Sequence, residues 1–141
     1  MAILVDAAPI IASIDKSSPY RVAAQQCLVA APEMLVIPSP VTAEVDYLLG
    51  ARVGEQARRA FLEDLAAQRY RVDCLEPGDY DVIVALEARY ADLRPGLADL
   101  SLVVLAERLR TRQIVTFDQR HFRAMTPLQG GSFEILPADH P

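Results

Sequence analysis

GLADLSLVVLAERLRTRQIVTFDQRHF, residues 96–122, predicts a helix followed by a buried strand and then a turn that carries an acid. Apolar side chains surround most of the predicted helix, and only Ser101, Glu107 and Arg108 mark a wetter side. We therefore expect this helix to be mostly buried. The short β-rich run at 114–117 follows it, with Asp118 at its carboxyl end.

Asp99 lies on the apolar side of this helix, because the residues three, four and seven positions after it are Leu, Val and Ala. An ionised carboxylate that faces a core costs several kcal/mol unless a cation or hydrogen-bond donors meet it. One interpretation is a capping aspartate, since backbone N–H groups in the first turn favour an acid. The position of Asp118 favours a site instead, because strand ends and helix N-termini form the ligand crevice of parallel α/β sheets.

Strands and helices alternate along the chain without an internal repeat or a linker. This order predicts an α/β fold, a three-layer α/β/α sandwich with a mainly parallel sheet of about five strands. We expect one domain over residues 1–136 and a short, frayed C-terminal tail over residues 137–141. The expected strands are 2–5, 34–37, 70–75 (at an edge), 114–117 and 133–136. Helices are expected at 7–14, 19–30, 55–68, 79–90 and 97–109. The helix at 19–30 is expected to be capped by Ser17 or Ser18. A further helix is expected to start at 39 and to be broken at Gly50.

The composition is that of one ordinary globular domain, with 141 residues of which 52% are hydrophobic. No apolar run is long enough for a bilayer and no signal peptide is recognisable, so we expect no membrane association and a cytoplasmic protein. The net charge of −5 argues against binding nucleic acid by bulk electrostatics. Cys27 and Cys74 lack the spacing of a zinc site or a disulfide scaffold, and we expect buried free thiols.

Four acids are expected at one edge of the sheet. Asp6 follows the first strand, Glu44 lies on the apolar face of the helix after the second, Asp99 opens a helix, and Asp118 follows the fourth strand. Asp46 falls on the opposite face from Glu44 and is expected to be exposed. Four carboxylates together repel one another, and a divalent cation relieves that repulsion. All-oxygen ligands favour Mg²⁺, with Mn²⁺ as a substitute, and the expected chemistry is phosphodiester hydrolysis.

Four segments resemble the PIN domain, specifically the VapC-type ribonuclease toxins, in order and over essentially the whole chain. They are AILVDAAPIIA, PSPVTAEVDYLL, YADLRPGLADLSLVVLAERL and IVTFDQRHF. The resemblance implies metal-ligand or catalytic roles for Asp6, Glu44, Asp99 and Asp118. It also implies a Mg²⁺-dependent endoribonuclease that acts on RNA as the toxin of a VapBC-type pair, with a VapB-like antitoxin and a homodimer.

Neighbouring residues are candidates for accessory roles. Thr116 matches a small hydroxyl beside the last acid of the family, although a β-branched strand residue is an equal interpretation. Arg120 and Arg123 are candidate phosphate contacts, and His121 is interpreted as a surface or RNA contact rather than a general base. Asp92 is either a solvated loop acid or an outer partner of the site.

Two functions from other classes compete with the RNase. One is a non-catalytic PIN-like module for protein interaction, and the other is a metal-dependent nuclease that acts on DNA. Fingerprints of other α/β enzymes, such as G-x-G-x-x-G, the Walker A loop and G-x-S-x-G, do not occur. We also expect the apolar helices near Asp6 and Glu44 to form a groove for an antitoxin helix, with an antitoxin arginine displacing the metal.

Overall fold

A computed structural model describes residues 1–31 and 33–140, and its centre is a sheet of five parallel strands. The strands are β1 (Ala2–Val5), β2 (Met34–Pro38), β3 (Arg71–Asp73), β4 (Gln113–Val115) and β5 (Glu134–Leu136). Their order across the sheet is β3-β2-β1-β4-β5, with β1 in the middle and β3 and β5 at the edges. The predicted parallel sheet and the edge position of the third strand are confirmed.

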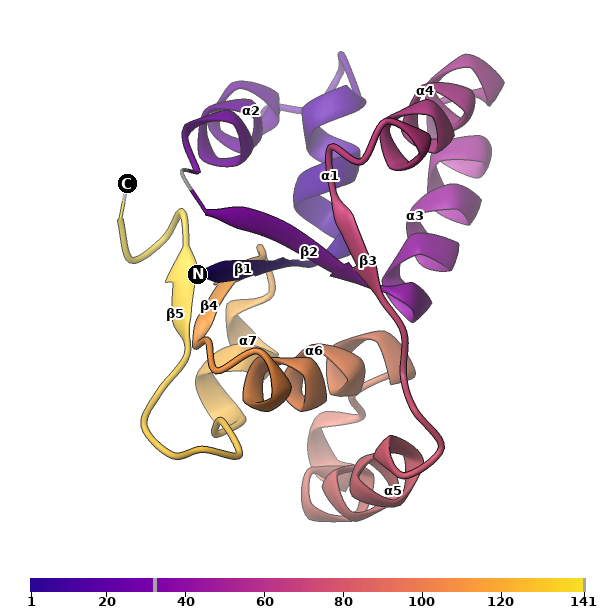
Figure 1. The fold of residues 1–141 in the computed structure, drawn as a ribbon. Helices are drawn as coiled ribbons and strands as arrows, with labels where there is room; N and C mark the ends of the chain where they lie inside the picture. Colours follow the sequence, from indigo (N-terminus) through magenta and orange to yellow (C-terminus); the bar gives the residue numbers. More distant parts are fainter. Residues whose placement is uncertain (32, 141) are drawn as a thin grey trace.

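Helices cover both faces of the sheet, which confirms the three-layer α/β/α sandwich. Figure 1 shows α1 to α4 above the sheet and α5 to α7 below it. The first group is α1 (Ala7–Ile14), α2 (Arg21–Ala30), α3 (Ser39–Arg52) and α4 (Glu55–Ala66). The second is α5 (Asp79–Arg89), α6 (Leu97–Arg108) and α7 (Gln119–Ala124), with the short 3₁₀ helix η1 (Ala91–Leu93) before α6.

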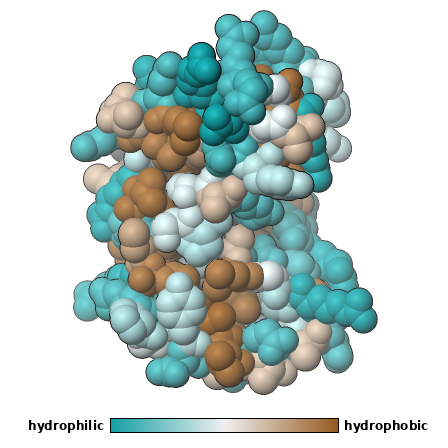
Figure 2. All heavy atoms as spheres, turned by 90° about the vertical axis from the view of Figure 1, so that its right-hand side faces the viewer, coloured by the Kyte–Doolittle hydropathy of each residue, from teal (hydrophilic) through white to brown (hydrophobic). Residues whose placement is uncertain are grey.

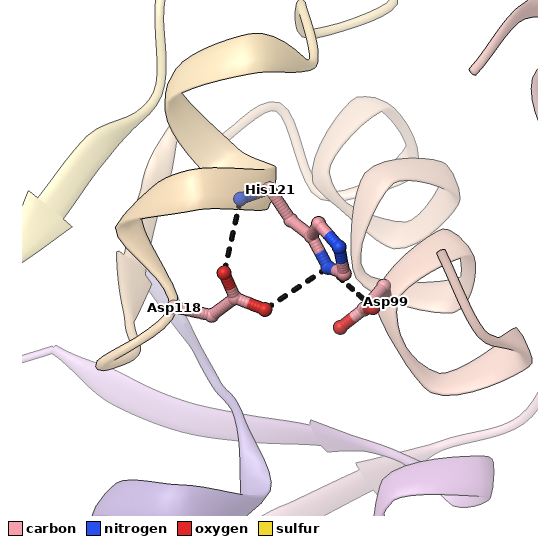
Figure 3. A group of neighbouring side chains, drawn as sticks. All are labelled: Asp99, Asp118 and His121. Carbon is pink, nitrogen blue, oxygen red and sulfur yellow. Dashed lines mark hydrogen bonds and ion pairs between the residues drawn. The ribbon is translucent and has the colours of Figure 1, made fainter. Parts of the chain in front are cut away.

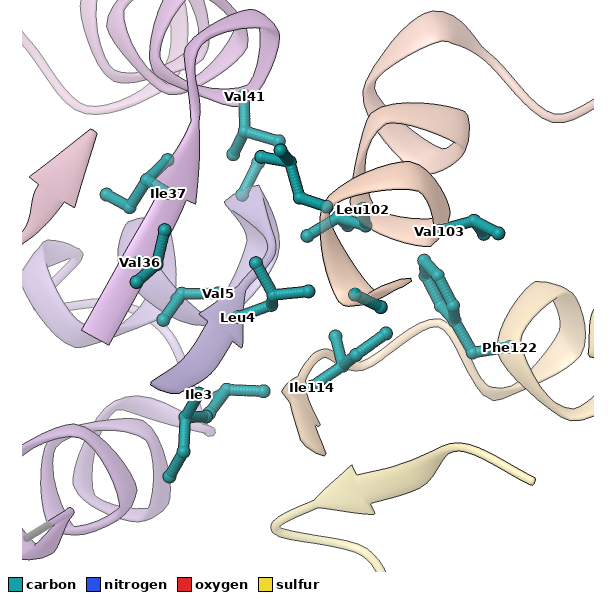
Figure 4. Close-up of a cluster of buried hydrophobic side chains, with 14 of the residues drawn as sticks. Ile3, Leu4, Val5, Val36, Ile37, Val41, Leu102, Val103, Ile114 and Phe122 are labelled. Carbon is teal, nitrogen blue, oxygen red and sulfur yellow. The ribbon is translucent and has the colours of Figure 1, made fainter. Parts of the chain in front are cut away.

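The core is centred on β1 and α6, as Figure 4 shows. Leu4 pairs in register with Val36 on β2 and with Ile114 on β4, and all three are fully buried. Every residue of α6 from 100 to 106 is buried, which confirms the prediction of a buried helix. Short apolar strands buried on both faces are typical of a parallel sheet between helix layers. The carboxyl ends of β1, β2 and β4 are thereby fixed relative to the start of α6.

Several helix boundaries differ from the expected ones by one or two residues, and two of these differences have a clear local cause. Helix α2 begins at Arg21 rather than at Pro19, because the Ser18 hydroxyl accepts from Tyr20 N and closes a turn instead of capping the helix. Helix α3 continues through Gly50 to Arg52. A Cβ at Gly50 would lie 3.3 Å from the Arg58 side chain, so the glycine allows α4 to pack close rather than ending α3. The chain breaks at Gly54, whose φ of 141° favours glycine.

The region after β4 contains a helix that was not expected. Asp118 caps α7 by accepting from His121 N at 2.9 Å, and the helix buries Phe122 against Phe133. The tail is also tied down as far as residue 140 rather than frayed, because Asp139 pairs with Arg123 and accepts from Ile135 N. The last residue of the predicted tail, 141, lies outside the described residues.

The prediction that both cysteines are buried free thiols is wrong for Cys74. Cys27 and Cys74 are both free, but Cys74 is exposed because it lies at the end of an edge strand, not in the core. Figure 2 shows the face that carries α3, α4 and α5, where hydrophobic patches interrupt a mostly hydrophilic surface. Val82 and Val84 of α5 are among the exposed large hydrophobic residues. Among residues 1–31 and 33–140, no helix combines the length and the apolar character needed to cross a membrane.

Candidate metal centre

All four predicted acids line one cavity of about 470 Å³ at the carboxyl edge of the sheet. Asp6 follows β1, Glu44 lies in the second turn of α3, Asp99 lies in the first turn of α6 and Asp118 lies between β4 and α7. The parallel topology therefore brings together residues that lie more than 100 positions apart in the sequence. A larger cavity of about 760 Å³, between β2, β3 and α4, contains none of these acids.

Asp6 is the most buried of the four acids, with 7% of its surface exposed. Its Oδ1 accepts from Ala7 N at 2.8 Å, and its Oδ2 accepts from the Thr116 hydroxyl at 2.8 Å. Burial raises the pKa of Asp6 to about 6, and the negative charges of Asp99 and Glu44 act in the same direction. The two hydrogen bonds oppose this rise without cancelling it. The surroundings of Asp6 therefore disfavour its ionised form.

Thr116 connects two of the acids through its hydroxyl group. The side chain is buried, with 1% exposed, and donates to Asp6 while its Oγ1 accepts from Asp118 N at 3.0 Å. A β-branched residue at this position suits the end of β4, but the hydroxyl also fixes the turn that carries Asp118. The candidate hydroxyl therefore lies in contact with the acidic cavity.

His121 lies between Asp99 and Asp118, as Figure 3 shows. Its Nδ1 is 3.0 Å from Asp99 Oδ2 and 2.9 Å from Asp118 Oδ2, and its Nε2 is 2.9 Å from Leu93 O. All three partners are hydrogen-bond acceptors. The sequence-based interpretation of His121 as a surface contact is wrong, since 14% of the side chain is exposed and the ring is held by acids of the cavity.

Glu44 reaches the cavity from α3, on the side facing Asp99. Burial raises the pKa of Glu44, the charge of Asp99 raises it further, and the Arg52 guanidinium lowers it. The residue itself is exposed, because its face of α3 borders the open cavity rather than the core. Asp46, which was expected to be free in solvent, is half-buried and pairs with Arg58 at 2.9 Å, because α4 packs on that side of α3.

Three other candidate residues lie away from the cavity. Arg123 pairs with Asp139 at 2.5 Å and so is engaged within the fold. Arg120 is exposed on α7 and Asp92 is exposed in η1, and neither lines the cavity. Arg52 is the one cation among the residues that line it, in the part of the chain that the structure describes. The signal that could have identified Arg52 is its spacing, eight residues after Glu44 and so about two helical turns along the same side of α3.

The donor set suits a divalent cation. Asp99, Asp118 and His121 each offer a ligand atom, and these atoms lie within 4.8 Å of one another. Asp6 and Glu44 add two further carboxylates to the lining of the same cavity. Both nitrogens of His121 are engaged by acceptors of the fold, so the carboxylate oxygens are the ligands that suit a hard divalent cation. An acidic cluster able to hold a metal is therefore present at the predicted edge of the sheet.

The sequence resemblance predicts a parallel α/β sandwich with acids clustered at its carboxyl edge. Comparison with known proteins identifies the class of protein to which this arrangement belongs. The family model of the PIN domain matches residues 3–126, so the chain belongs to the PIN domain family. Members of this nuclease family are typically metal-dependent. The resemblance found in the sequence is thereby confirmed.

Particular relatives are toxins of the VapC type. Ribonuclease VapC26 of Mycobacterium tuberculosis is 36% identical over 134 residues, which cover 95% of this chain and 99% of that protein. The crystal structure of M. tuberculosis VapC20, a toxin that cleaves the sarcin–ricin loop, has a TM-score of 0.77 at 16% identity and covers 83% of this chain and 90% of that one. The crystal structure of VapBC2 of Rickettsia felis, bound to a promoter DNA fragment, has a TM-score of 0.69 at 18% identity. The match covers 96% of this chain and 98% of that chain.

Proposed function

We propose that the chain is a metal-dependent endoribonuclease whose cation is Mg²⁺, with Mn²⁺ as a substitute. The observation that supports this most strongly is the convergence of four carboxylates on one cavity, together with the raised pKa values of Asp6 and Glu44. Acids arranged in this way repel one another until a cation neutralises them. Asp6, Glu44 and Asp99 are the proposed ligands, with Asp118 as the fourth acid. A divalent cation bound there supplies Lewis acidity to the scissile phosphate and makes a neighbouring water easier to deprotonate.

The residues of the chain have separate tasks in this proposal. Asp6 is fixed by Thr116 and by Ala7 N, so one carboxylate has a set orientation before substrate arrives. Glu44 is bound by no side chain in the described residues and lines the cavity together with Asp99, so its carboxylate is available to the cation.

RNA is the proposed substrate, because the relative VapC26 is named a ribonuclease. The test is cleavage of matched RNA and DNA oligonucleotides by wild-type protein and by Asp99→Asn, with Mg²⁺ and with EDTA. We expect Mg²⁺-dependent cleavage of RNA, and none by the variant. Cleavage of DNA alone would support the rival DNA nuclease. Cleavage of neither, with no Mg²⁺ binding by titration, would support a non-catalytic interaction module.

Arg52 is the proposed contact for an RNA phosphate next to the scissile one. It lines the acidic cavity and also a second cavity of about 570 Å³, which Lys16 lines as well, so the two cavities adjoin at Arg52. Arginine binds phosphate in a bidentate manner. Arg120, His121 and Arg123 were the sequence-based candidates for RNA contact. Of these, Arg120 stays a candidate because it is exposed on α7, while Arg123 and His121 are engaged by acids of the fold.

A VapB-like antitoxin is the proposed protein partner, and the structural relatives include a toxin–antitoxin complex from Klebsiella pneumoniae, with a TM-score of 0.65 at 21% identity. Ile11 and Ala12 of α1 and Leu48 of α3 line the cavity beside the acids. An amphipathic antitoxin helix fits such an apolar groove, and an arginine from it would pair with the acids in place of the cation. A complex in which no antitoxin residue approaches Asp6 or Asp99 would contradict the displacement.

A homodimer is the remaining proposal about assembly. Exposed apolar side chains on α2 and α5, among them Val29 and Val84, leave surface that a second copy would cover. Light scattering during size-exclusion chromatography of the purified chain measures the mass directly. Twice the chain mass of 15.5 kDa is expected, and the single-chain mass at micromolar concentration would contradict it.

A further inference from the structure

We propose that His121 is a positioning residue that holds Asp99 and Asp118 at a fixed separation and so sets how tightly the cavity binds its cation. This inference rests on the proposed function, because it concerns the same acidic site. Three observations carry it: the two carboxylate contacts of Nδ1, the anchoring of Nε2, and the continuity of the hydrogen bonds that link the acids. All three are observations of which atoms lie within hydrogen-bond distance of one another.

The bridge itself joins carboxylates that belong to two different elements. Asp99 belongs to the first turn of α6, and Asp118 caps α7. Nδ1 of His121 lies 3.0 Å from Asp99 Oδ2 and 2.9 Å from Asp118 Oδ2, so one ring atom sets the distance between the carboxylates. Two carboxylates at this distance repel each other, so they move apart when the atom between them is removed.

The ring is in turn fixed from both sides. Its Nε2 donates to Leu93 O at 2.9 Å, on the 3₁₀ turn before α6, and its own backbone N donates to Asp118 Oδ1 at 2.9 Å. The imidazole therefore has little freedom to rotate. A ligand whose partner is rigid loses less entropy when it binds a cation, and outer partners of this kind commonly change metal affinity about 10- to 100-fold.

The bridge also completes a connected path through three acids. Asp6 accepts from the Thr116 hydroxyl, Thr116 Oγ1 accepts from Asp118 N, and Asp118 and Asp99 meet at His121. The remaining oxygen of Asp99, Oδ1, accepts no hydrogen bond from any residue in 1–31 or 33–140. The path thus orients Asp99 while leaving one of its oxygens available to a cation.

A matched pair of substitutions tests the bridge. In His121→Asn the side-chain amide nitrogen replaces Nδ1, whereas in His121→Gln it reaches the place of Nε2 and leaves the carboxylates without their donor. Both variants are polar and similar in size. His140→Gln is the control, because His140 pairs with Glu134 at the far edge strand. Mn²⁺ affinity is measured by calorimetry or electron paramagnetic resonance without RNA, and kcat and KM for RNA are measured separately.

We expect His121→Gln to bind Mn²⁺ about tenfold or more weakly, and to lose kcat while KM for RNA stays within about twofold. His121→Asn is expected to restore most of the Mn²⁺ affinity, and His140→Gln to match wild type. Equal Mn²⁺ affinity in wild type and His121→Gln would overturn this inference but not the proposed function. An equal loss of Mn²⁺ affinity in both His121 variants would do the same. Failure of the wild-type chain to bind Mn²⁺ would overturn the proposed function as well.

Discussion

The Thr116 hydroxyl donates to Asp6 Oδ2 at 2.8 Å, although 110 positions separate the two residues in the sequence. This bond joins the carboxyl ends of β1 and β4, and both side chains are buried. We predict that Thr116→Val destabilises the metal-free fold by about 1–2 kcal/mol at pH 7, because a buried carboxylate loses its donor. Urea unfolding measures the change. Thr42→Val is the matched control, since the Thr42 hydroxyl donates only to Ser39 O within its own helix.

The pKa of Asp6 predicts how the stability of the metal-free protein depends on pH. Because the folded-state pKa is about 6 and the usual value is 3.8, the folded chain holds this proton more tightly than the unfolded chain. Below about pH 4 the ionisation of Asp6 therefore does not lower the free energy of unfolding. The free energy of unfolding falls as the pH rises from about 4, and the full loss is reached above pH 6. Asp6→Asn is expected to gain stability relative to wild type across that window, by at most about 3 kcal/mol.

The measurement is urea unfolding of both proteins in EDTA at several pH values. A stability difference that is constant between pH 4 and pH 7 would contradict the raised pKa of Asp6. Added Mg²⁺ should reverse the order at pH 7, because the cation stabilises only the chain that keeps its ligand.

Arg52→Gln tests the proposed path of the RNA. We expect KM for RNA to rise about fivefold with little change in kcat, because a partly exposed charge-assisted contact contributes about 1 kcal/mol. The effect should shrink at high salt. Arg59→Gln is the control, since Arg59 is exposed on α4 and does not line the cavity. Equal effects of the two substitutions would show that general charge, not position, accounts for RNA binding.

Leu102→Ala tests the role of α6 as the buried element that positions Asp99. Leu102 is fully buried in the core (Figure 4). Its truncation is expected to lower the free energy of unfolding by about 3–4 kcal/mol through lost burial and the cavity left behind. Val84→Ala, at an exposed position of α5, should change it by less than about 0.5 kcal/mol. A small effect at Leu102 would mean that α6 is less tightly packed than its burial indicates.

The order of elements and the convergence of the acids could be predicted from the sequence, for a physical reason. Parallel strands buried on both faces leave short apolar runs such as 2–5, and acids placed directly after such runs share one sheet edge. Asp6 and Asp118 were found in this way. Asp99 was found by the mismatch between its charge and the apolar face of its helix.

The contacts of individual side chains could not be predicted, because they depend on distances between elements remote in sequence. His121 was interpreted as a surface residue because nothing local reveals that α7 forms and turns its ring toward Asp99. Arg123 was predicted to contact phosphate, and its ion pair with Asp139 was not foreseen because Asp139 lies in a stretch expected to be frayed. Gly50 was expected to break α3, although the close approach of Arg58 explains why glycine is present there.

A crystal structure of the chain soaked in Mn²⁺, with an anomalous difference map, tests most directly whether the four acids share a cation. The account predicts one or more peaks in the cavity, about 2.1 Å from carboxylate oxygens of Asp6 and Asp99. A map with no peak in this cavity at saturating Mn²⁺, or with peaks only at other sites, would contradict it.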